Sequence, residues 1–304
     1  MTKLDTPIAA VSQARPRRPR ATGRLLLNAA LAVLFLGAAL TVEVDLTRLL
    51  EAPAAIWRIL VLMFSAPDWS ELERASGLML ESIHIAWIGT IMGAILSLPL
   101  AFLAAKNVTS RTGSTVVRQV LNAIRAVPEL ILAIAFIPIV GLGAFAGTMA
   151  IGLHSIGTLG KLASEAIEGI DPGPVEAATS VGAPRMAVMR WGVLPQVLPE
   201  IVAFWLYRFE INIRAAAILG IVGAGGIGEG LSQTIIYRRW DRAGVYVIVI
   251  VLATVAIDAV SSRIRRRIIG GGDRAIKTKA DMVTDGHGQS GPDPAKGPNP
   301  RDFG

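Results

Sequence analysis

Ionisable side chains inside apolar stretches are the residues whose types and spacing most suggest chemistry. The segment FEINIRAAAILG contains Glu210, Asn212 and Arg214, and the segment IRAVPEL contains Arg125 and Glu129. The acid and the base in each segment are four positions apart, so they share a helix face and can neutralise each other. Charges within a membrane span are costly and are functional candidates by default. They either form structural ion pairs or line or gate a polar path for an anion.

Three further charged residues lie in apolar runs or at their ends. Lys161 and Glu165 are also four positions apart, close to one end of an apolar run, and we expect a structural pair. Asp258 lies in the last apolar run and is expected to pair with one of the basic groups. Glu210 lies about 16 Å beyond Pro199 along a helix, which places it near the middle of a bilayer.

Other chemistries lack the residues that they need. The chain has no cysteine and only three scattered histidines, so neither a thiolate site nor a metal site is expected. No nucleophile–base constellation is evident, so we expect neither enzymatic activity nor a cofactor. The run from Gly223 to Gly228 satisfies G-x-G-x-x-G, but it follows an apolar span and not a strand. Close helix packing is therefore expected there, and dinucleotide binding is not.

A polar insert from Asp171 to Pro199 separates two long apolar runs. Asp171 can cap a helix that Pro172 opens, and a second short helical run is expected to end at Leu194-Pro195. Gly182 is expected where the two short helices bend closely. The spacing resembles the EAA loop of ABC-importer permeases, which docks on an ATP-hydrolysing subunit; the alternative is an ordinary cytoplasmic loop. The resemblance assigns the ATPase contact to Glu176, Ala177, Ala178, Gly182, Leu194 and Pro195.

The composition is that of an integral membrane protein. Hydrophobic residues make up 52% of the 304 residues and charged residues only 17%, well below the share in a soluble protein. A tight turn over residues 141–144 divides two of the apolar runs. The six expected spans are Leu25–Val42, Leu78–Ala105, Val120–Leu142, Phe145–Ile167, Glu200–Val222 and Val245–Val260.

The basic residues predict the orientation of the chain. A net charge of +7 could indicate nucleic-acid binding, but the arginines cluster beside apolar runs, as the positive-inside rule describes. We therefore expect no nucleic-acid partner, and we place both termini, the 106–118 loop and the 171–199 loop in the cytoplasm. Arg238, Arg239 and Arg242 fall on the opposite face, where a partner or anionic headgroups are their candidate contacts.

Composition also divides the chain into four parts. The first span follows a basic segment and is expected to remain as a signal-anchor. Within the segment after it, Pro53–Phe64 is expected to form a helix along the outer membrane surface, or a solvated connector. The expected parts are a disordered basic N-terminus (1–24), the first span with a periplasmic amphipathic segment (25–76), a transmembrane domain (77–268) and a disordered tail (269–304).

Several longer segments carry a family resemblance that covers roughly residues 45–268. The segments are LNAIRAVPELILA, GLHSIGTLGKLASEAIEGIDPGPVEAA, GVLPQVLPEI, YRFEINIRAAAILGIVGAGGIGEG and DAVSSRIRRRI. Together they resemble the permease of phosphonate ABC importers, whereas the EAA pattern alone marks any ABC-importer permease. The resemblance implies an all-α, polytopic type I (MetI-like) permease in a bacterial inner membrane.

The resemblance also implies partners and a substrate class. It implies a cytoplasmic ATPase subunit, a periplasmic phosphonate-binding protein and, because the chain holds one coupling loop, a homodimer in the lipid bilayer. The chain has no G-x-x-x-x-G-K-[ST] loop, so ATP hydrolysis is expected in the partner. The substrate is expected to be a phosphonate, phosphite or phosphate. The competing hypothesis is an ion-coupled secondary transporter that uses Glu129, Glu210 and Asp258.

Overall fold

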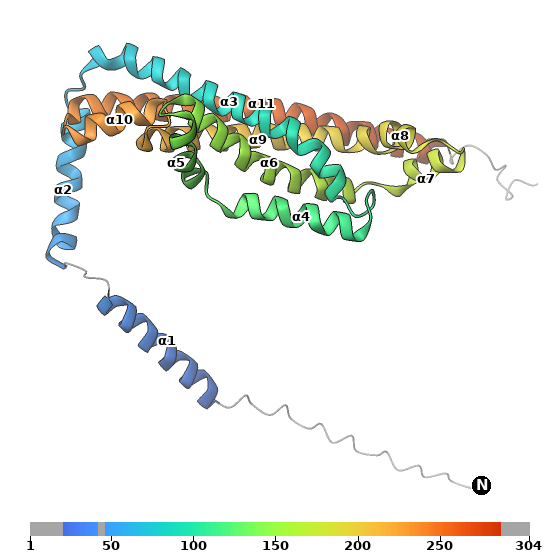
Figure 1. Cartoon of the computed structure of the whole chain (residues 1–304), viewed down its shortest axis with the longest axis horizontal. Helices are drawn as coiled ribbons and strands as arrows, with labels where there is room; N and C mark the ends of the chain where they lie inside the picture. The colour runs from blue at the N-terminus through green and yellow to red at the C-terminus, as the bar shows by residue number, and fades with distance from the viewer. Residues whose placement is uncertain (1–20, 42–45, 287–304) are drawn as a thin grey trace, which may run out of the picture. The chain divides into compact units, whose positions relative to one another are not determined.

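The computed structural model describes residues 21–41 and 46–286 of the chain, and every regular element in these residues is helical (Figure 1). The chain divides into two compact units, residues 1–60 and residues 61–304. The first 20 residues of the expected disordered N-terminus and residues 287–304 of the expected disordered tail lie outside the described residues.

The first unit consists of α1 (Ala21–Thr41) and most of α2 (Leu46–Phe64). In α1, the segment Gly23–Thr41 is long and apolar enough to cross a membrane, in agreement with the first predicted span. The helix expected over Pro53–Phe64 begins seven residues earlier, with Pro53 inside it. The apolar spacing Leu46, Leu49, Leu50 continues the helical period across the proline, which is why the helix extends further than expected.

The second unit is a bundle whose central pair is α3 and α6, with α9 packed on both. A 3-10 turn precedes α3, and another follows α9. Its helices are α3 (Leu72–Ala104), α4 (Arg111–Ala126), α5 (Glu129–Val140), α6 (Ala144–Glu168), α7 (Pro172–Ser180), α8 (Arg185–Ala187), a π-helix (Val188–Val193), α9 (Leu194–Leu219), α10 (Ile227–Ile236) and α11 (Trp240–Gly286).

Fewer helices meet a length-and-hydropathy criterion for crossing a membrane than the six spans expected from the sequence. Among the described residues, three helices are long and apolar enough to cross a membrane, and two bent helix pairs raise the number to as many as five. The fourth predicted span corresponds closely to α6, but α6 does not meet the same criterion. Its glycines and hydroxyl side chains face neighbouring helices, with Gly147, Gly152 and Ser155 among its buried residues. The surface that α6 packs against its neighbours is therefore less apolar than the surface of a lipid-facing helix, which lowers the mean hydropathy of α6.

The third predicted span is divided into two helices. The chain turns by 84° between α4 and α5, at Val127 and Pro128, where the sequence predicts only a kinked helix. Proline removes a backbone donor and pushes the residue before it out of helical conformation. The basic loop expected over 106–118 is shorter as well. Ser110 accepts a hydrogen bond from the Gly113 N–H (3.3 Å), so α4 already begins at Arg111.

Small residues hold α3 and α6 together. Gly89 and Gly93 lie one turn apart on α3, and a methyl group added at either would meet α6, 2.8 Å from Ile151 Cγ2 and 2.5 Å from Ser155 Cβ, respectively. Helices in a bilayer associate through close packing of this kind, because lipid removes most of the hydrophobic driving force between them. The two glycines therefore determine how closely the central helices approach.

Two glycine turns meet at one end of the bundle. The Gly143 N–H, after α5, donates a 2.8 Å hydrogen bond to the Gly223 carbonyl, after α9, and both residues have positive φ. The Ser82 hydroxyl of α3 accepts a 2.9 Å hydrogen bond from the Ile227 N–H at the start of α10. These contacts agree with the expectation that the Gly223–Gly228 run serves close packing.

Helices α9 and α11 are both longer than predicted. Helix α9 begins at Leu194 and runs through Pro195 and Pro199 without a break. Pro195 lies in the first turn, where a proline loses no intrahelical hydrogen bond, whereas Pro199 lies inside the helix and removes one. Helix α11 continues past Gly270 to Gly286, into the region where a disordered tail is expected. Residues 275–282 (AIKTKADM) are mostly good helix formers, which favours this continuation.

Candidate coupling surface and translocation site

The predicted coupling loop forms a compact projection at the N-terminal end of α9. Asp171 caps α7 by accepting a 2.9 Å hydrogen bond from the Gly173 N–H, and Pro172 is its first residue, as predicted. The Gln196 amide joins both ends of the projection. It donates to the carbonyls of Asp171 (3.2 Å) and Gly192 (2.6 Å) and accepts from the Asp171 N–H (3.0 Å).

The role of Gly182 in the projection differs from the one expected, and the close approach occurs at another glycine. Gly182 has φ +74, and a methyl group added there would meet nothing within 4 Å. Its conformation, and not a close helix contact, therefore requires glycine. The close approach is at Gly192, where an added methyl would lie 3.3 Å from Val175 Cα on α7.

The projection exposes both polar and apolar side chains. Helix α7 has no buried residue, and Glu176 and Ala177 are exposed while Ala178 is half-buried. Three large apolar side chains around it are also largely exposed: Val181 (82%), Met186 (79%) and Trp191 (70%). Of the remaining predicted contact residues, Pro195 is exposed and Leu194 packs partly inward. Such a mixed surface at the tip of a projection is suited to a protein partner.

A buried polar network, the core polar cluster, joins α9 to α3 and α6. Its members are Thr90, His154, Ser155, Arg208 and Asn212. The Asn212 amide donates to the hydroxyls of Thr90 (2.8 Å) and Ser155 (3.0 Å), and the Arg208 Nε donates to Ser155 Oγ (3.2 Å). The Asn212 Oδ1 is buried with no hydrogen-bond partner among the described residues. An unpaired polar group is costly in an apolar setting. The cluster is therefore a candidate either for binding a water molecule at Asn212 Oδ1 or for a direct role in transport.

The geometry around His154 determines its tautomer. Arg208 Nη2 lies 2.6 Å from His154 Nδ1, and because a guanidinium can only donate, Nδ1 must be the acceptor. The ring is then neutral, and the 3.6 Å contact between Glu129 and Nδ1 is not an ion pair. Glu129 instead lies in the electrostatic field of Arg208.

The predicted pair Arg125–Glu129 is not formed. The bend at Pro128 separates α4, which carries Arg125, from α5, which carries Glu129, so the helical spacing does not apply. Arg125 is exposed, and Glu129 is half-buried beside His154.

The predicted pair Glu210–Arg214 is also not formed, because each residue has a different partner on α11. Glu210 accepts from Arg265 Nη2 at 3.1 Å, and Arg214 contacts Asp258 at 3.1 Å. The expectation that Asp258 pairs with a basic group is confirmed, and so is the pair Lys161–Glu165 (2.9 Å). Through Arg265, Glu210 is paired with the basic part of α11.

The two ion pairs between α9 and α11 differ in burial. Only 8% of the Glu210 side chain is exposed, whereas Arg214 and Asp258 are 47% and 42% exposed. An ion pair on an open helix face within a membrane needs a polar surrounding. The Arg214 face of α9 is therefore a candidate for either a path or a subunit contact.

Sequence reasoning missed Arg208, His154, Ser155 and Gln196. Arg208 could have been found, since it is a third charged residue in the same span and lies four positions before Asn212. The roles of the other three depend on partners distant in sequence: Asp171 lies 25 positions from Gln196, and Arg208 lies more than 50 positions from His154 and Ser155.

Comparison with known proteins agrees with these features. Residues 97–270 match the family described as "Binding-protein-dependent transport system inner membrane component". The chain is 39% identical over 201 residues to the phosphite transport system permease protein PtxC of Stutzerimonas stutzeri, covering 66% of this chain and 73% of that protein. It is 44% identical over 190 residues to the phosphate-import permease protein PhnE of Mycolicibacterium smegmatis, covering 62% of this chain but only 36% of that longer protein.

A solved structure has the same fold. A chain of the MetNI methionine ABC transporter, in an inward-facing conformation, matches with a TM-score of 0.56. The match covers 62% of this chain and 93% of that chain at 21% identity, so the likeness concerns the fold alone. The all-α, MetI-like permease fold predicted from the sequence is thereby confirmed.

Proposed function

The chain belongs to the family of binding-protein-dependent transport system inner membrane components, and from this premise we propose that it is the permease subunit of an ATP-driven importer of phosphonates or related phosphorus oxyanions. The alignment with the phosphite permease PtxC carries this proposal, because it covers 73% of that protein. Permeases of this family are membrane subunits that work with a separate ATPase and a substrate-binding protein, so this chain is a transport subunit and not an enzyme.

The projection at residues 171–199 is proposed as the contact with the ATPase. Its support is the exposed α7 helix with Glu176, and the exposed apolar side chains of Met186 and Trp191. Glu176 would make a charge-assisted contact with a basic group of the ATPase, while the apolar side chains would fill its groove. The projection, and with it both termini, would then lie in the cytoplasm, and the substrate-binding protein would approach from the periplasm.

A homodimer is proposed from two features. Each chain has one coupling projection, whereas an importer of this kind closes on two. The open ion pair Arg214–Asp258 would also be covered by a second copy or a water-filled path between copies.

Among the predicted path residues, we propose that the exposed cations Arg125 and Arg214 meet the anion and that Glu129, beside His154, lines the same path. Glu210 and Asn212 are buried in contacts within their own chain and are proposed to position α9. A basic group where water is scarce stabilises a passing anion more strongly than the same group in water.

Transport into proteoliposomes tests the proposal. The full chain would be reconstituted with the ATPase and the binding protein of the same system, and uptake of phosphite and methylphosphonate measured with and without ATP. We expect uptake only with ATP and both partners. Uptake that follows a proton gradient without the ATPase would instead support the ion-coupled hypothesis, for which Glu129, Glu210 and Asp258 are the candidate carboxylates. Of these, Glu210 and Asp258 each form an ion pair with an arginine of this chain.

A further inference from the structure

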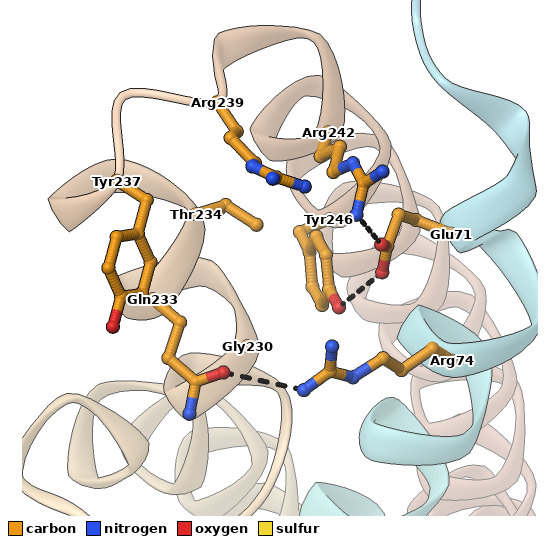
Figure 2. A pocket seen from close by; sticks show the side chains of 9 residues that line it. All are labelled: Glu71, Arg74, Gly230, Gln233, Thr234, Tyr237, Arg239, Arg242 and Tyr246. Carbon is orange, nitrogen blue, oxygen red and sulfur yellow. Dashed lines mark hydrogen bonds and ion pairs between the residues drawn. The ribbon is translucent and has the colours of Figure 1, made fainter.

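A second polar site lies at the end of the bundle opposite the coupling projection, between α3, α10 and α11 (Figure 1). It is a pocket of about 440 Å³, which we call the arginine pocket (Figure 2). That volume lies within the usual range for small-molecule sites. The pocket is lined by Glu71, Arg74, Gly230, Gln233, Thr234, Tyr237, Arg239, Arg242 and Tyr246.

One side of the pocket is built rigidly around Arg242. Arg242 bridges two carboxylates, Glu71 at 2.6 Å and Asp68 at 3.1 Å, and the Tyr246 hydroxyl donates to Glu71 at 3.2 Å. Hydrogen bonds from Ser70 and the charge of Arg242 lower the pKa of the Asp68 carboxyl, so it remains ionised at neutral pH. The charge of Arg242 is therefore neutralised within the chain.

The wall behind Tyr246 is equally well defined. Tyr246 is fully buried, and a methyl group added at Gly230 would collide with its ring. Glycine at this position therefore lets α10 lie directly against α11, so the pocket has a fixed floor and is not a gap between loosely packed helices.

The other two arginines are not neutralised. Arg74 donates only to the neutral amide oxygen of Gln233 (3.3 Å), and the Arg239 side chain has no hydrogen bond or ion pair within residues 21–41 and 46–286. Figure 2 shows Arg239 and Arg74 reaching the hollow from opposite sides, with Tyr237 beside it. Two guanidinium groups with free N–H donors thus face one cavity.

The charge of the site indicates an anionic ligand. The lining holds three arginines and one glutamate, a formal excess of two positive charges, and Asp68 reduces this excess to one. In the proposed orientation this end faces the periplasm, where the positive-inside rule predicts few arginines. Arginine also matches a tetrahedral oxyanion better than lysine does, because its planar fork donates two hydrogen bonds to adjacent oxygens.

We propose that the arginine pocket binds a phosphorus oxyanion at the periplasmic end of the permease, ahead of the membrane path. Arg239 and Arg74 would bind its oxygens, and Tyr237 would donate a further hydrogen bond. This inference rests on the proposed function for the direction of transport and for the substrate class. The ligand would be free substrate or the phosphate of a lipid headgroup, since both present the same chemistry.

Equilibrium binding to the full chain in phosphatidylcholine nanodiscs tests the site, with inorganic phosphate and methylphosphonate as the probes. A hydrogen bond to a charged group contributes about 1.5–3 kcal/mol, so Arg239→Gln and Arg74→Gln should each weaken binding about tenfold or more. The matched control is Arg238→Asn, next in sequence but outside the lining, which should change binding less than about twofold. Asparagine is chosen there because Arg238 has φ +55, a left-handed conformation that asparagine tolerates.

Other results distinguish the sources of the ligand. If the soluble anions do not bind, but phosphatidylglycerol co-purifies with the wild-type chain and is lost in Arg239→Gln, the pocket holds a lipid phosphate. Binding of neither, or binding that is unaffected by Arg239→Gln in a chain with an unchanged melting temperature, overturns the proposal. Weaker capture of the purified substrate-binding protein with unchanged anion binding also overturns it, since the pocket would then be a protein contact.

The two proposals can fail separately. If the wild-type permease supports ATP-dependent phosphite uptake but binds neither the soluble anions nor phosphatidylglycerol, the pocket proposal is overturned and the proposed function stands. If phosphate binds and the binding depends on Arg239, but no ATP-dependent uptake occurs, the pocket proposal is supported and the proposed function is overturned.

Discussion

The pairing of Glu210 on α9 with Arg265 on α11, and not with Arg214 of its own helix, can be measured as a coupling free energy. The structure pairs Glu210 with Arg265 at 3.1 Å, whereas the spacing along α9 favours Arg214. Glu210 is only 8% exposed, so Arg265→Gln would leave a buried carboxylate without its partner. Loss of one member of a buried pair costs about 3–5 kcal/mol, and we expect the lower end because Arg265 is 28% exposed.

A double-mutant cycle separates this pair from the alternative. Glu210→Gln combined with Arg265→Gln should restore much of the lost free energy of unfolding, giving a coupling of about 2 kcal/mol. Glu210→Gln combined with Arg214→Gln should be additive to within about 0.5 kcal/mol, because the two side chains share no partner. The free energy of unfolding of each variant would be measured by SDS titration in detergent micelles.

A second arginine of α11, Arg263, provides the control. Arg263→Gln removes an exposed charge near Arg265 that has no ion pair among the described residues, so it should shift stability by less than about 0.5 kcal/mol. A coupling for Glu210 and Arg214 equal to or larger than that for Glu210 and Arg265 would refute the assignment of partners.

Three further predictions concern helix contacts and the coupling projection. Glu176→Arg should leave the chain folded and inserted, since α7 has no buried residue, but abolish ATP-dependent uptake and weaken co-purification of the ATPase; unchanged uptake would contradict the coupling role. Gly182→Val should destabilise the projection by about 1–2 kcal/mol through its φ of +74, seen as increased proteolysis there, whereas Gly182→Asn should be tolerated. Gly93→Val should lower the melting temperature by separating α3 from α6, whereas Gly77→Val on the same helix should have little effect because an added methyl meets nothing there; equal shifts would refute the packing argument.

Local features of the fold could be predicted from the sequence. Asp171 and Pro172 start α7 as expected, and α6 (Ala144–Glu168) lies within about one residue of its predicted span, because these boundaries depend on capping and turn residues close by in sequence. The Lys161–Glu165 pair is likewise formed within one helix.

Features that depend on tertiary contacts could not be predicted. The four-residue rule assumes that one helix continues, but Pro128 divides one pair and α11 supplies partners to the other. The core polar cluster joins residues of three helices that are more than 50 positions apart, for example Arg208 with Ser155. A G-x-x-x-G spacing at Gly89 and Gly93 was available as a signal for the α3–α6 contact, since this spacing marks close helix packing in membranes.

The π-helix at Val188–Val193 has a consequence for the rotational phase between the coupling projection and α9. A π turn accommodates one residue more than an α turn, and each residue of an α-helix advances the chain by about 100° around the axis. Because each π turn holds the additional residue, the segment absorbs it and keeps α7 nearly in phase with α9. Deleting one residue from this segment, with a return to α geometry, would therefore leave the direction of Glu176 nearly unchanged. The same deletion within α9, where no π turn can absorb it, would turn everything before it by about 100° relative to the rest of the helix.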